Sequence, residues 1–407
     1  MVEADPLTGL LARYLCRMTP GPIRTLDLFA GAGGLTAGFH AASPRIETVA
    51  AVEWEIAAAA SFEANFGRGK VWAGSIQSWL AESEMPTDID VVLGGPPCQG
   101  FSTLGKQDVE DERNDLWRTY AETIRRVRPK YFVVENVAAF TKSPQFREFE
   151  AAVQPGEILE DYTFECRILN AADYGAPQAR KRAVLIGHRR DLPAPGFPVP
   201  THLGNHRTVR DVLMMEHRVS FETIDERSLA ERSIEFAGKI FKGPYSGLEL
   251  HTSRNYSPLS LQRFEVIPAG GNRFDLPYEL QADCWRKHRT GSADVMGRLH
   301  WDKPAVTIRT EFFKPEKGRY LHPEAMRSIS LYEAAILQGF PTDYKFVGSR
   351  TAIAKQIGNA VPIPLGAAIA KQLVEVLNGE TPAALGPAVL FPIEGASVLR
   401  EERIPLF

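Results

Sequence analysis

The chain has 407 residues, of which 44% are hydrophobic, and a net charge of −3, which indicates an ordinary globular protein of two domains. Its four cysteines lie far apart, without a Cys-X-X-Cys pair or a histidine spacing typical of zinc. We therefore expect no disulfide, no metal site and a reducing cytoplasm. No stretch approaches the roughly 18 apolar residues of a membrane span, and no secretion signal opens the chain, which argues against membrane insertion and export.

The small net charge hides two basic segments. Residues 285–319 hold nine Lys/Arg against four Asp/Glu, and residues 178–190 hold five Lys/Arg and no acidic residue. Basic segments of this kind are often only solvated surface, but they are also typical of polyanion-binding faces.

Short apolar segments alternate with helical patterns from Ile23 to about Arg190. This alternation predicts a Rossmann-like α/β domain, in which helices cover both faces of a mainly parallel sheet. The strands that we expect are Thr25–Phe29, Thr48–Glu53, Val91–Leu93, Tyr131–Glu135, Phe164–Leu169 and Ala183–Gly187.

The pattern changes after the proline-rich run Pro193–Pro200, where regular alternation ends. We expect an irregular second domain with short strands, then helices at Leu331–Gln338 and from about Ile363 to Leu377. The expected division is a lead-in over residues 1–22, a larger domain over 23–192 that is completed by 342–378, a smaller domain over 193–341, and a C-terminal extension over 379–407.

The first expected strand runs into a glycine turn with the sequence LDLFAGAGGL at 26–35. Glycines between a strand and a helix let a ligand approach the backbone closely, and a nucleotide-like cofactor is the usual ligand. The next strand ends in Glu53 and Trp54, a carboxylate that can hold ribose hydroxyls and an indole that can cover an adenine. These residues favour an adenosine-containing cofactor without saying which one.

A cysteine, a carboxylate and two arginines follow later strands. Cys98 lies in the stretch GGPPCQGFS that directly follows the third expected strand, and Glu135 ends the fourth, so both lie at the carboxyl edge where open α/β sheets bind ligands. Arg180 and Arg182 enter the last strand on one face. A nucleophile, a carboxyl group and a guanidinium suit attack on an electron-poor heterocycle, whose ring nitrogen and carbonyl the latter two would hold.

Taken in order, these motifs resemble those of the DNA (cytosine-5)-methyltransferases of bacterial restriction–modification systems. The resemblance spans residues 25–370, apart from the central insert. It implies methyl transfer from S-adenosylmethionine to carbon 5 of a cytosine in double-stranded DNA, with S-adenosylhomocysteine as product. The cytosine would be flipped out of the duplex. The motifs that carry it are DLFAGAGG at 27–34, VEWE at 52–55, GGPPCQGFS at 94–102, GKQDVEDERN at 105–114, ENV at 135–137, QARKR at 178–182, TIRT at 307–310, LQGFP at 337–341 and KQIGNAVP at 355–362.

The resemblance also implies a role for each site residue. Cys98 would add to carbon 6 of the cytosine, Glu135 would hold the ring nitrogen and the exocyclic amine, and Arg182 would bind the carbonyl, with Arg180 in support. The implied cofactor site comprises Phe29, Ala30, Gly31, Gly33, Gly34, Glu53, Trp54, Ser75, Ile76, Pro97, Asn359 and Ala360. The implied DNA contacts are Gln99, Ser102, Lys106, Arg113, Arg298 and Thr307.

Two departures from the family pattern stand out. The family often has Asp where this chain has Ser75, which bears on the contacts to adenine. It usually has arginines where this chain has Tyr332 and Ile336, in the element that organises the target-recognition domain.

Three alternatives remain open from the sequence alone. An RNA cytosine-5 methyltransferase would keep the chemistry and act on tRNA, although that branch carries a shorter insert. A catalytically silent DNA- or nucleotide-binding protein is disfavoured by the intact Cys98, Glu135 and Arg182. A nicotinamide-dependent oxidoreductase would leave the cysteine and arginine motifs without a role. For the favoured DNA methyltransferase we expect a monomer in the bacterial cytoplasm that associates with the nucleoid during action. We expect no membrane partner and a functional link to a cognate restriction endonuclease.

Overall fold

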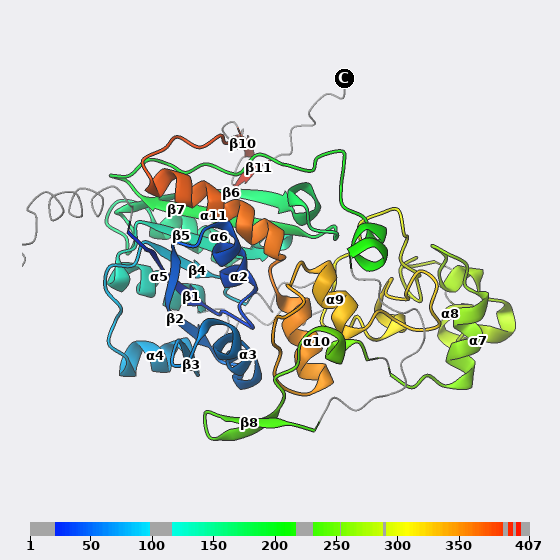
Figure 1. The fold of residues 1–407 in the computed structure, drawn as a ribbon. Helices are drawn as coiled ribbons and strands as arrows, with labels where there is room; N and C mark the ends of the chain where they lie inside the picture. The colour runs from blue at the N-terminus through cyan, green and yellow to red at the C-terminus, as the bar shows by residue number, and fades with distance from the viewer. Residues whose placement is uncertain are drawn as a thin grey trace, which may run out of the picture.

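The fold is described from a computed structural model that covers residues 21–97, 116–216, 231–252, 254–287, 290–385, 390–393 and 396–399. Cys98 and the loop that follows it lie outside the described residues. Within these ranges the chain forms a larger lobe built on one sheet and a smaller, mainly irregular lobe (Figure 1).

A seven-stranded sheet with the order β3-β2-β1-β4-β5-β7-β6 forms the centre of the larger lobe. The neighbours from β3 to β5 pair in parallel, and the short apolar runs that were expected as strands are all confirmed, with ends displaced by at most two residues. The strands are β1 (Ile23–Leu28), β2 (Ile46–Glu53), β3 (Val71–Ala73), β4 (Val91–Gly94), β5 (Tyr131–Val137), β6 (Tyr162–Asn170) and β7 (Lys181–Arg189).

The last two strands run antiparallel to their neighbours. Only residues 171–180, without a crossover helix, join β6 to β7, and a parallel return would need a connection of about a dozen or more residues. As a result β7 begins where β5 ends, so that Arg182 pairs with Val137 in the register. This reversal brings the start of β7 to the same edge of the sheet as the carboxyl ends of β1, β4 and β5.

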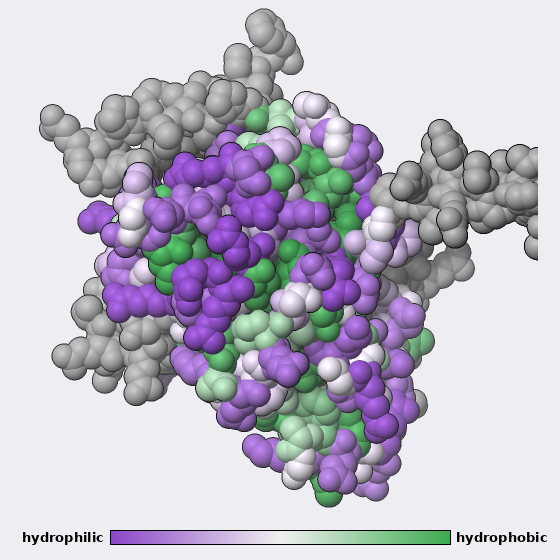
Figure 2. All heavy atoms as spheres, turned by 90° about the vertical axis from the view of Figure 1, so that its left-hand side faces the viewer, coloured by the Kyte–Doolittle hydropathy of each residue, from purple (hydrophilic) through white to green (hydrophobic). Residues whose placement is uncertain are grey.

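Helices cover both faces of the sheet. On one face α2 (Gly34–Ala42) and α11 (Ile363–Leu377) share an apolar cluster with the strands, and on the other α4 (Ile76–Glu82), α5 (Leu116–Val127) and α6 (Pro144–Ala152) share a second cluster. The helix α3 (Ile56–Phe66) lies beside the β2–β3 edge. Figure 2 shows that hydrophilic side chains, with small apolar patches between them, cover the outer face of this lobe.

The helices α2 and α11 approach each other closely at a pair of glycines. A Cβ added at Gly38 would lie 2.8 Å from the Cα of Gly366 and 2.9 Å from the backbone nitrogen of Ala367. Such distances leave no room for a side chain, so the C-terminal helix α11 is packed tightly into the larger lobe. None of the described helices alone is long and apolar enough to span a membrane, although α10 (Arg350–Asn359) and α11 together pass on length and composition.

The smaller lobe has little regular structure, as expected. It contains the hairpin β8 (Ser233–Phe236) and β9 (Lys239–Lys242), the helices α7 (Pro258–Val266) and α8 (Asp283–Lys287), and a small core around Phe264. The helices α9 (Leu331–Leu337) and α10 lie between this lobe and the sheet (Figure 1) and belong to one large apolar cluster that both lobes share. Every residue of α9 is buried, including Tyr332 and Ile336, so these two side chains pack as core residues.

The proline-rich run that marks the change of pattern is itself packed against the larger lobe. Phe197 is buried in the same apolar cluster as α11, and the side-chain amide of Gln372 donates to the carbonyl of Pro195 at 2.7 Å. A backbone bond from Leu385 to Phe197 adds the start of the C-terminal extension to this contact.

Candidate functional site

The glycine turn after β1 has the conformation that cofactor binding requires. Phe29, Gly31 and Gly33 have positive φ angles of 60°, 58° and 93°, which glycine adopts readily and other residues adopt rarely. A Cβ at Gly31 would meet open space, whereas one at Gly33 would clash with Phe66 at 2.3 Å. The turn therefore exposes backbone at Gly31 to a ligand and holds its other side against α3.

Glu53 and Trp54 lie directly beside this turn. The carboxylate of Glu53 accepts hydrogen bonds from the backbone N–H groups of Gly31 and Glu55, both at 2.7 Å. Its side chain is buried, and burial raises its pKa to about 7 against the opposing effect of these bonds. Trp54 leaves 67% of its surface exposed. A fixed carboxylate beside an exposed indole fits the ribose and the base of an adenosine-containing cofactor.

A second buried carboxylate under the turn was quoted in the motif but not predicted as a site residue. Asp27 is 1% exposed and accepts a hydrogen bond of 2.5 Å from the hydroxyl of Thr36 in the first turn of α2. Burial raises its pKa to about 7, and the nearby carboxylate of Glu53 adds to the rise. The aspartate thus anchors the helix that follows the turn. The sequence contained this residue, but its burial depends on the fold.

The remaining cofactor residues are distributed unevenly around the turn. Ser75 caps α4 by accepting from the backbone N–H of Ser78 at 3.0 Å. The Ile76 side chain is buried in the core, so that side chain is not available to a ligand. Ala360 is close to the turn, because a Cβ at Gly34 would lie 3.0 Å from the Cβ of Ala360. Asn359 ends α10 next to it and is exposed.

Glu135 and Arg182 form a second group at the same edge of the sheet. The Nε of Arg182 lies 2.8 Å from the Oε1 of Glu135, and both side chains are almost buried, with 13% and 11% exposed. The N–H is not directed at this oxygen, which is left without a hydrogen bond. A buried acceptor without a donor is uncommon in proteins and calls for a partner. The pair is therefore ready to accept a ligand's donor.

The segment that leads to Cys98 is held against this pair. A Cβ at Gly95 would meet the carbonyl oxygen of Glu135 at 3.2 Å and its carboxylate at 3.5 Å. The side-chain amide of Asn136 donates to the carbonyl of Pro96 at 2.9 Å. The chain thus reaches Pro97 beside Glu135. Cys98, Gln99, Ser102, Lys106 and Arg113 lie outside the described residues, so their predicted roles stay predictions.

Arg180 lies near this pair, but its guanidinium is used within the protein. It is 3% exposed and donates to the carbonyls of Ile308 at 2.9 Å and Gly358 at 3.1 Å. Burial lowers its pKa to about 9, and the like charge of Arg182 contributes to this shift. The geometry makes Arg180 a connection between the base of β7, the TIRT segment and the end of α10.

Two buried glutamines extend this connection, and neither was predicted as a functional residue. The side chain of Gln178 accepts from the backbone N–H of Ile308 at 2.8 Å and donates to Gln338 at 2.8 Å. Gln338 in turn donates to the carbonyl of Ile357 at 2.6 Å. Four separate sequence motifs therefore meet in one buried hydrogen-bond network, which we call the junction network, at the boundary of the lobes. The residues of this network are part of the sequence motifs, but only the fold shows that they contact one another.

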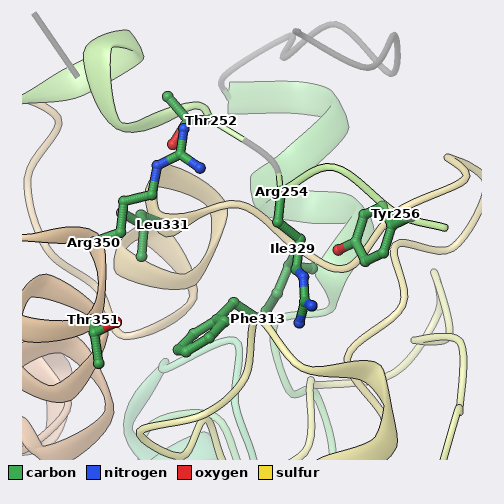
Figure 3. Close-up of a pocket in the computed structure, with 8 residues that line it drawn as sticks. All are labelled: Thr252, Arg254, Tyr256, Phe313, Ile329, Leu331, Arg350 and Thr351. Carbon is green, nitrogen blue, oxygen red and sulfur yellow. The ribbon is translucent and has the colours of Figure 1, made fainter. Parts of the chain in front are cut away.

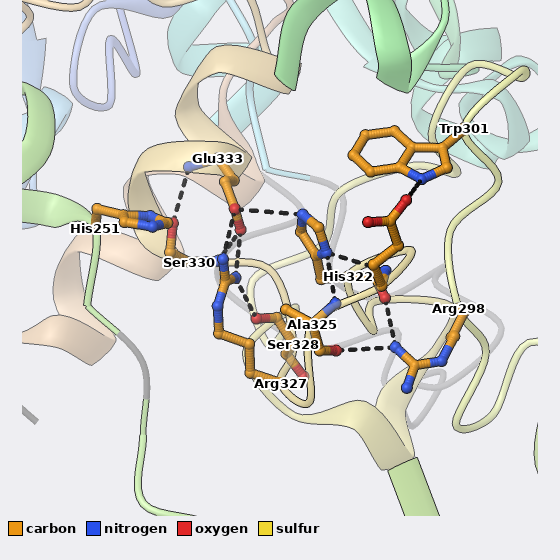
Figure 4. A network of polar contacts seen from close by, with 10 residues as sticks. His251, Arg298, Trp301, His322, Ala325, Arg327, Ser328, Ser330 and Glu333 are labelled. Carbon is orange, nitrogen blue, oxygen red and sulfur yellow. Dashed lines mark hydrogen bonds and ion pairs between the residues drawn. The ribbon is translucent and has the colours of Figure 1, made fainter. Parts of the chain in front are cut away.

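The prediction that Arg298 contacts DNA is wrong for this structure. Its guanidinium is buried and donates to the backbone carbonyls of Phe264, Ile267, His322 and Ala325. Figure 4 shows the bonds to His322 and Ala325. Four acceptors use up the donors that a phosphate or a base would need. Arg298 instead holds the small lobe together.

The other described candidate for a DNA contact, Thr307, is half-buried. It donates to the carbonyl of Ala179 at 3.0 Å, which places it at the junction between the lobes rather than on an open face.

Two candidate ligand sites therefore lie side by side at one edge of the sheet. One is a glycine turn with a buried carboxylate and an exposed indole, and the other is a buried carboxylate–guanidinium pair next to Gly95. This arrangement is suited to bringing an adenosine-containing cofactor and a polar heterocycle together. Within the described residues, no group of three or more His, Cys, Asp or Glu side chains is placed to hold a metal ion.

Comparisons with known proteins agree with this geometry. A family model described as C-5 cytosine-specific DNA methylase matches residues 23–375. The type II methyltransferase M1.HphI of Haemophilus parahaemolyticus is 33% identical over 366 residues, which cover 87% of each chain. The type II methyltransferase M.XorII of Xanthomonas oryzae pv. oryzae is 32% identical over 386 residues, covering 87% of this chain and 85% of the relative.

Solved structures give the same fold. A putative DNA modification methyltransferase encoded within an E. coli prophage superposes with a TM-score of 0.64 at 23% identity, covering 88% of this chain and 99% of the other. The S. pombe Dnmt2 methyltransferase superposes with a TM-score of 0.52 at 15% identity, over 88% and 99% of the two chains. With the family model matched from the first strand to the last helix, the chain belongs to the C-5 cytosine-specific DNA methylase family and is a DNA (cytosine-5)-methyltransferase.

Proposed function

We propose that this enzyme takes the methyl group from S-adenosylmethionine and transfers it to a cytosine flipped out of double-stranded DNA, through a covalent bond between Cys98 and the base. The observation that carries the proposal is the buried, unfilled acceptor of Glu135 beside Arg182. Strands β1, β4 and β5 are neighbours with a spacing of about 4.8 Å. The glycine turn and Glu135 are therefore about 10 Å apart, close enough for cofactor and base to meet.

The residues divide the chemistry between them. When bound, S-adenosylmethionine would supply an electrophilic methyl group on a sulfonium. The thiolate of Cys98 would add to carbon 6 of the cytosine, which makes carbon 5 nucleophilic. Glu135 would accept from the exocyclic amine and share a proton with the ring nitrogen, while Arg182 would donate to the carbonyl. After methyl transfer a base would remove the carbon 5 proton, and the thiolate would leave as the double bond returns.

The cofactor residues around the glycine turn fit this donor. The carboxylate of Glu53 would accept from the ribose hydroxyls, and the exposed face of Trp54 would cover the adenine. Backbone at Gly31, and Asn359 beside Ala360, would line the same site. S-Adenosylhomocysteine would leave from it after transfer.

The insert would select the DNA sequence. Residues 193–341 would act as the target-recognition domain facing the catalytic domain over 23–192 and 342–378, and the loop from Gly100 to Leu116 would close over the DNA. The proposed loop contacts are Gln99, Ser102, Lys106 and Arg113. The likeness to two type II methyltransferases supports a protective role beside a cognate restriction endonuclease. The enzyme would act as a monomer.

Base-resolution methylation sequencing tests the proposal. Duplex DNA treated with the purified enzyme and S-adenosylmethionine should carry 5-methylcytosine within one short motif. Cys98→Ala should lower the rate of methyl transfer by at least about 10³-fold, because the covalent step is lost. Cys284→Ala is the matched control, since Cys284 is an exposed free thiol in the smaller lobe.

Two further results would decide against the proposal. Wild-type enzyme should form a stable adduct with duplex DNA that contains 5-fluorocytosine, and its absence would contradict the covalent mechanism. A Cys98→Ala enzyme that methylates at the normal rate would refute the assignment of the nucleophile, and methylation of tRNA but not of duplex DNA would overturn the substrate.

A further inference from the structure

One carbonyl of the glycine turn is held by a side chain from far along the chain. The hydroxyl of Tyr344 donates to the backbone oxygen of Ala32 at 2.5 Å, and both residues are buried. Ala32 lies between Gly31, where an added Cβ would meet open space, and Gly33, where it would meet the same hydroxyl at 3.0 Å. This bond therefore fixes the turn directly beside the backbone that is open to a ligand.

No second donor serves this carbonyl among the residues that the structure describes. The regular helical partner would be the backbone N–H of Thr36, but that group donates to the buried carboxylate of Asp27 instead. A buried carbonyl without a donor is uncommon in proteins. Removing the Tyr344 hydroxyl would thus leave the Ala32 carbonyl unsatisfied, and the turn would have to shift to reach water or another donor.

The ring that carries this hydroxyl is fixed in an aromatic cluster. Its centroid lies 4.7 Å from that of Phe340 and 5.3 Å from that of Phe346. Phe66 of α3 contacts the same ring at 6.3 Å and also closes the space at Gly33, where an added Cβ would lie 2.3 Å away. These neighbouring rings thus keep the hydroxyl of Tyr344 directed at the turn.

The segment around Tyr344 joins the insert to the helix beside the turn. Lys345 and Asn65 of α3 exchange two hydrogen bonds, from the Lys345 backbone N–H at 3.0 Å and from the Asn65 amide at 2.8 Å. Phe346 exchanges two backbone hydrogen bonds of 2.8 Å with Tyr245 of the insert. Tyr344 is therefore placed by contacts of both lobes, and its hydroxyl transmits their position to the glycine turn.

Close packing alone does not fix the two lobes along α10. A cavity of about 170 Å³ remains between the smaller lobe and the start of this helix (Figure 3). Its lining includes Phe313, Ile329 and Leu331 from the insert and Arg350 and Thr351 from α10. Protein interiors contain few voids larger than a water molecule, so the lobes are not fully packed against each other here. Directed hydrogen bonds such as that of Tyr344 are therefore needed to align the turn with the insert.

We propose that Tyr344 is a positioning residue for the cofactor, which holds the Gly31 backbone in its binding orientation through the carbonyl of Ala32. The inference rests on the proposed function, in which S-adenosylmethionine binds at this turn. Tyr344 is buried and its hydroxyl is already used, so it acts through the turn and not by touching the cofactor. The turn would bind the cofactor equally before and during methyl transfer, so the effect falls on the KM for S-adenosylmethionine and not on kcat.

Replacing Tyr344 by phenylalanine tests this proposal, because the ring stays and only the hydroxyl is lost. Calorimetry should show the Kd of S-adenosylmethionine for Tyr344→Phe rising about 5- to 20-fold, as expected for a buried acceptor that loses its donor. The Kd of S-adenosylhomocysteine should rise by the same factor, since both ligands would use the same turn. In steady-state methylation of duplex DNA, the KM for S-adenosylmethionine should rise about as much, with kcat within about 2-fold of wild type.

Tyr162→Phe is the matched control. The Tyr162 hydroxyl is buried and donates to the carbonyl of Pro129 at 2.8 Å, so both variants lose one bond of the same kind. Pro129 precedes β5, at the edge of the sheet opposite the glycine turn. Urea unfolding should show similar losses of stability for the two variants, while Tyr162→Phe keeps the Kd of S-adenosylmethionine within about 2-fold of wild type.

The outcomes separate this inference from the proposed function. Wild-type enzyme that binds no S-adenosylmethionine would refute the proposed function. Wild-type enzyme that binds it and methylates DNA, together with an unchanged Kd for Tyr344→Phe, would refute only the positioning role. An equal rise of the Kd in Tyr162→Phe would assign the effect to lost stability and overturn the inference. A fall of kcat with an unchanged KM would place the effect of the hydroxyl in methyl transfer itself and would also contradict the positioning role.

Discussion

The buried ion pair that fixes the start of α9 offers the sharpest test of the packing between the lobes. Arg327 and Glu333 make two parallel hydrogen bonds of 2.7 and 2.8 Å, and their side chains are 2% and 1% exposed (Figure 4). The same carboxylate accepts from the backbone N–H of Ser330 at 2.8 Å and completes a capping box. Changing Glu333 to leucine removes the pair and the cap together.

The expected cost follows from these two losses. Leaving a buried guanidinium without its carboxylate lowers the free energy of unfolding by about 3–5 kcal/mol. Loss of the helix cap lowers it by about 1 kcal/mol more. Glu333→Leu should therefore lower the free energy of unfolding by about 4–6 kcal/mol. In the double variant Arg327→Met/Glu333→Leu no unpaired charge remains. Its free energy of unfolding should return to within about 2 kcal/mol of wild type, because apolar replacements of buried pairs are often close to neutral.

Urea unfolding followed by circular dichroism measures both values at pH 7. The difference between the double variant and the sum of the two single variants gives the coupling energy of the pair, which we expect to exceed about 2 kcal/mol. If Glu333→Leu costs less than about 1 kcal/mol, or if the two single losses simply add in the double variant, the reasoning from the buried pair is refuted.

The pH dependence of stability gives a second readout of the same cluster. Burial would raise the pKa of Glu333, but the Arg327 guanidinium outweighs it and lowers the pKa to about 2 in the folded state, below the 4.5 of an ordinary glutamate. The contribution of the pair is therefore complete above about pH 4.5 and is lost as the pH falls toward 2.

His322 beside the pair acts at higher pH. Burial lowers its pKa from 6.5 to about 4, so the unfolded chain takes up a proton first as the pH falls below 6.5. Stability should then decline by roughly 3 kcal/mol between pH 6.5 and 4, and His322→Gln should flatten this part of the profile.

Three further predictions concern other parts of the molecule. Arg180→Lys keeps the charge, but a lysine cannot reach both carbonyl acceptors of Arg180. The kcat of methyl transfer should therefore fall about 10- to 100-fold, while the Kd for S-adenosylmethionine stays within about 3-fold. A variant with the wild-type kcat would contradict a positioning role for Arg180. Gly38→Ala forces α2 away from α11 and should lower the free energy of unfolding, measured in urea, by about 1–3 kcal/mol. The control is Gly21→Ala, whose Cβ would meet nothing within 4 Å. It should lower the free energy of unfolding by less than about 0.5 kcal/mol. Burial raises the pKa of Glu53 to about 7, and in the proposed role its ionised carboxylate would accept from the ribose hydroxyls. Calorimetry should therefore show cofactor affinity falling as the pH drops from 8 to 6. A flat profile, as expected for Glu53→Gln, would contradict this role.

The sequence predicts most strands of the larger lobe well because each contains a short apolar run, and in β4 and β5 nearly every residue of that run is buried on both faces. The exception is β3 (Val71–Ala73), which was not expected. Its three residues, Val71 to Ala73, are apolar but form too short a run to mark a strand, and they are only half-buried at the edge of the sheet. The helix α10 was missed for a related reason, since its ten residues mix polar and apolar side chains.

The positions of Arg180, Arg182 and Arg298 show which properties of a site can be predicted from the sequence and which cannot. Arg182 lies beside Glu135 as expected, because β7 reverses direction and starts where β5 ends. Arg180 and Arg298 carry the same chemistry, yet both are buried and donate to backbone carbonyls. Charge and spacing are visible in a sequence, but which carbonyls lie within reach of a guanidinium depends on how the lobes pack.

The junction network explains how a long irregular insert can be held precisely. The insert leaves the larger lobe after β7 and returns at α9 and α10. Gln178 and Arg180 stand at the base of β7, and both bind Ile308 inside the insert. Gln338 and Arg180 then bind the end of α10 through Ile357 and Gly358.

Separating the lobes at this junction would leave buried donors and acceptors unsatisfied, at about 1–3 kcal/mol each. Since five bonds of this kind converge on segments next to Arg182 and Asn359, a shift of the insert has to move the base pocket and the cofactor edge as well. The proposed sequence selection by the insert and the alignment of the two ligand sites would thereby be coupled, and a change at Gln178 should disturb both together.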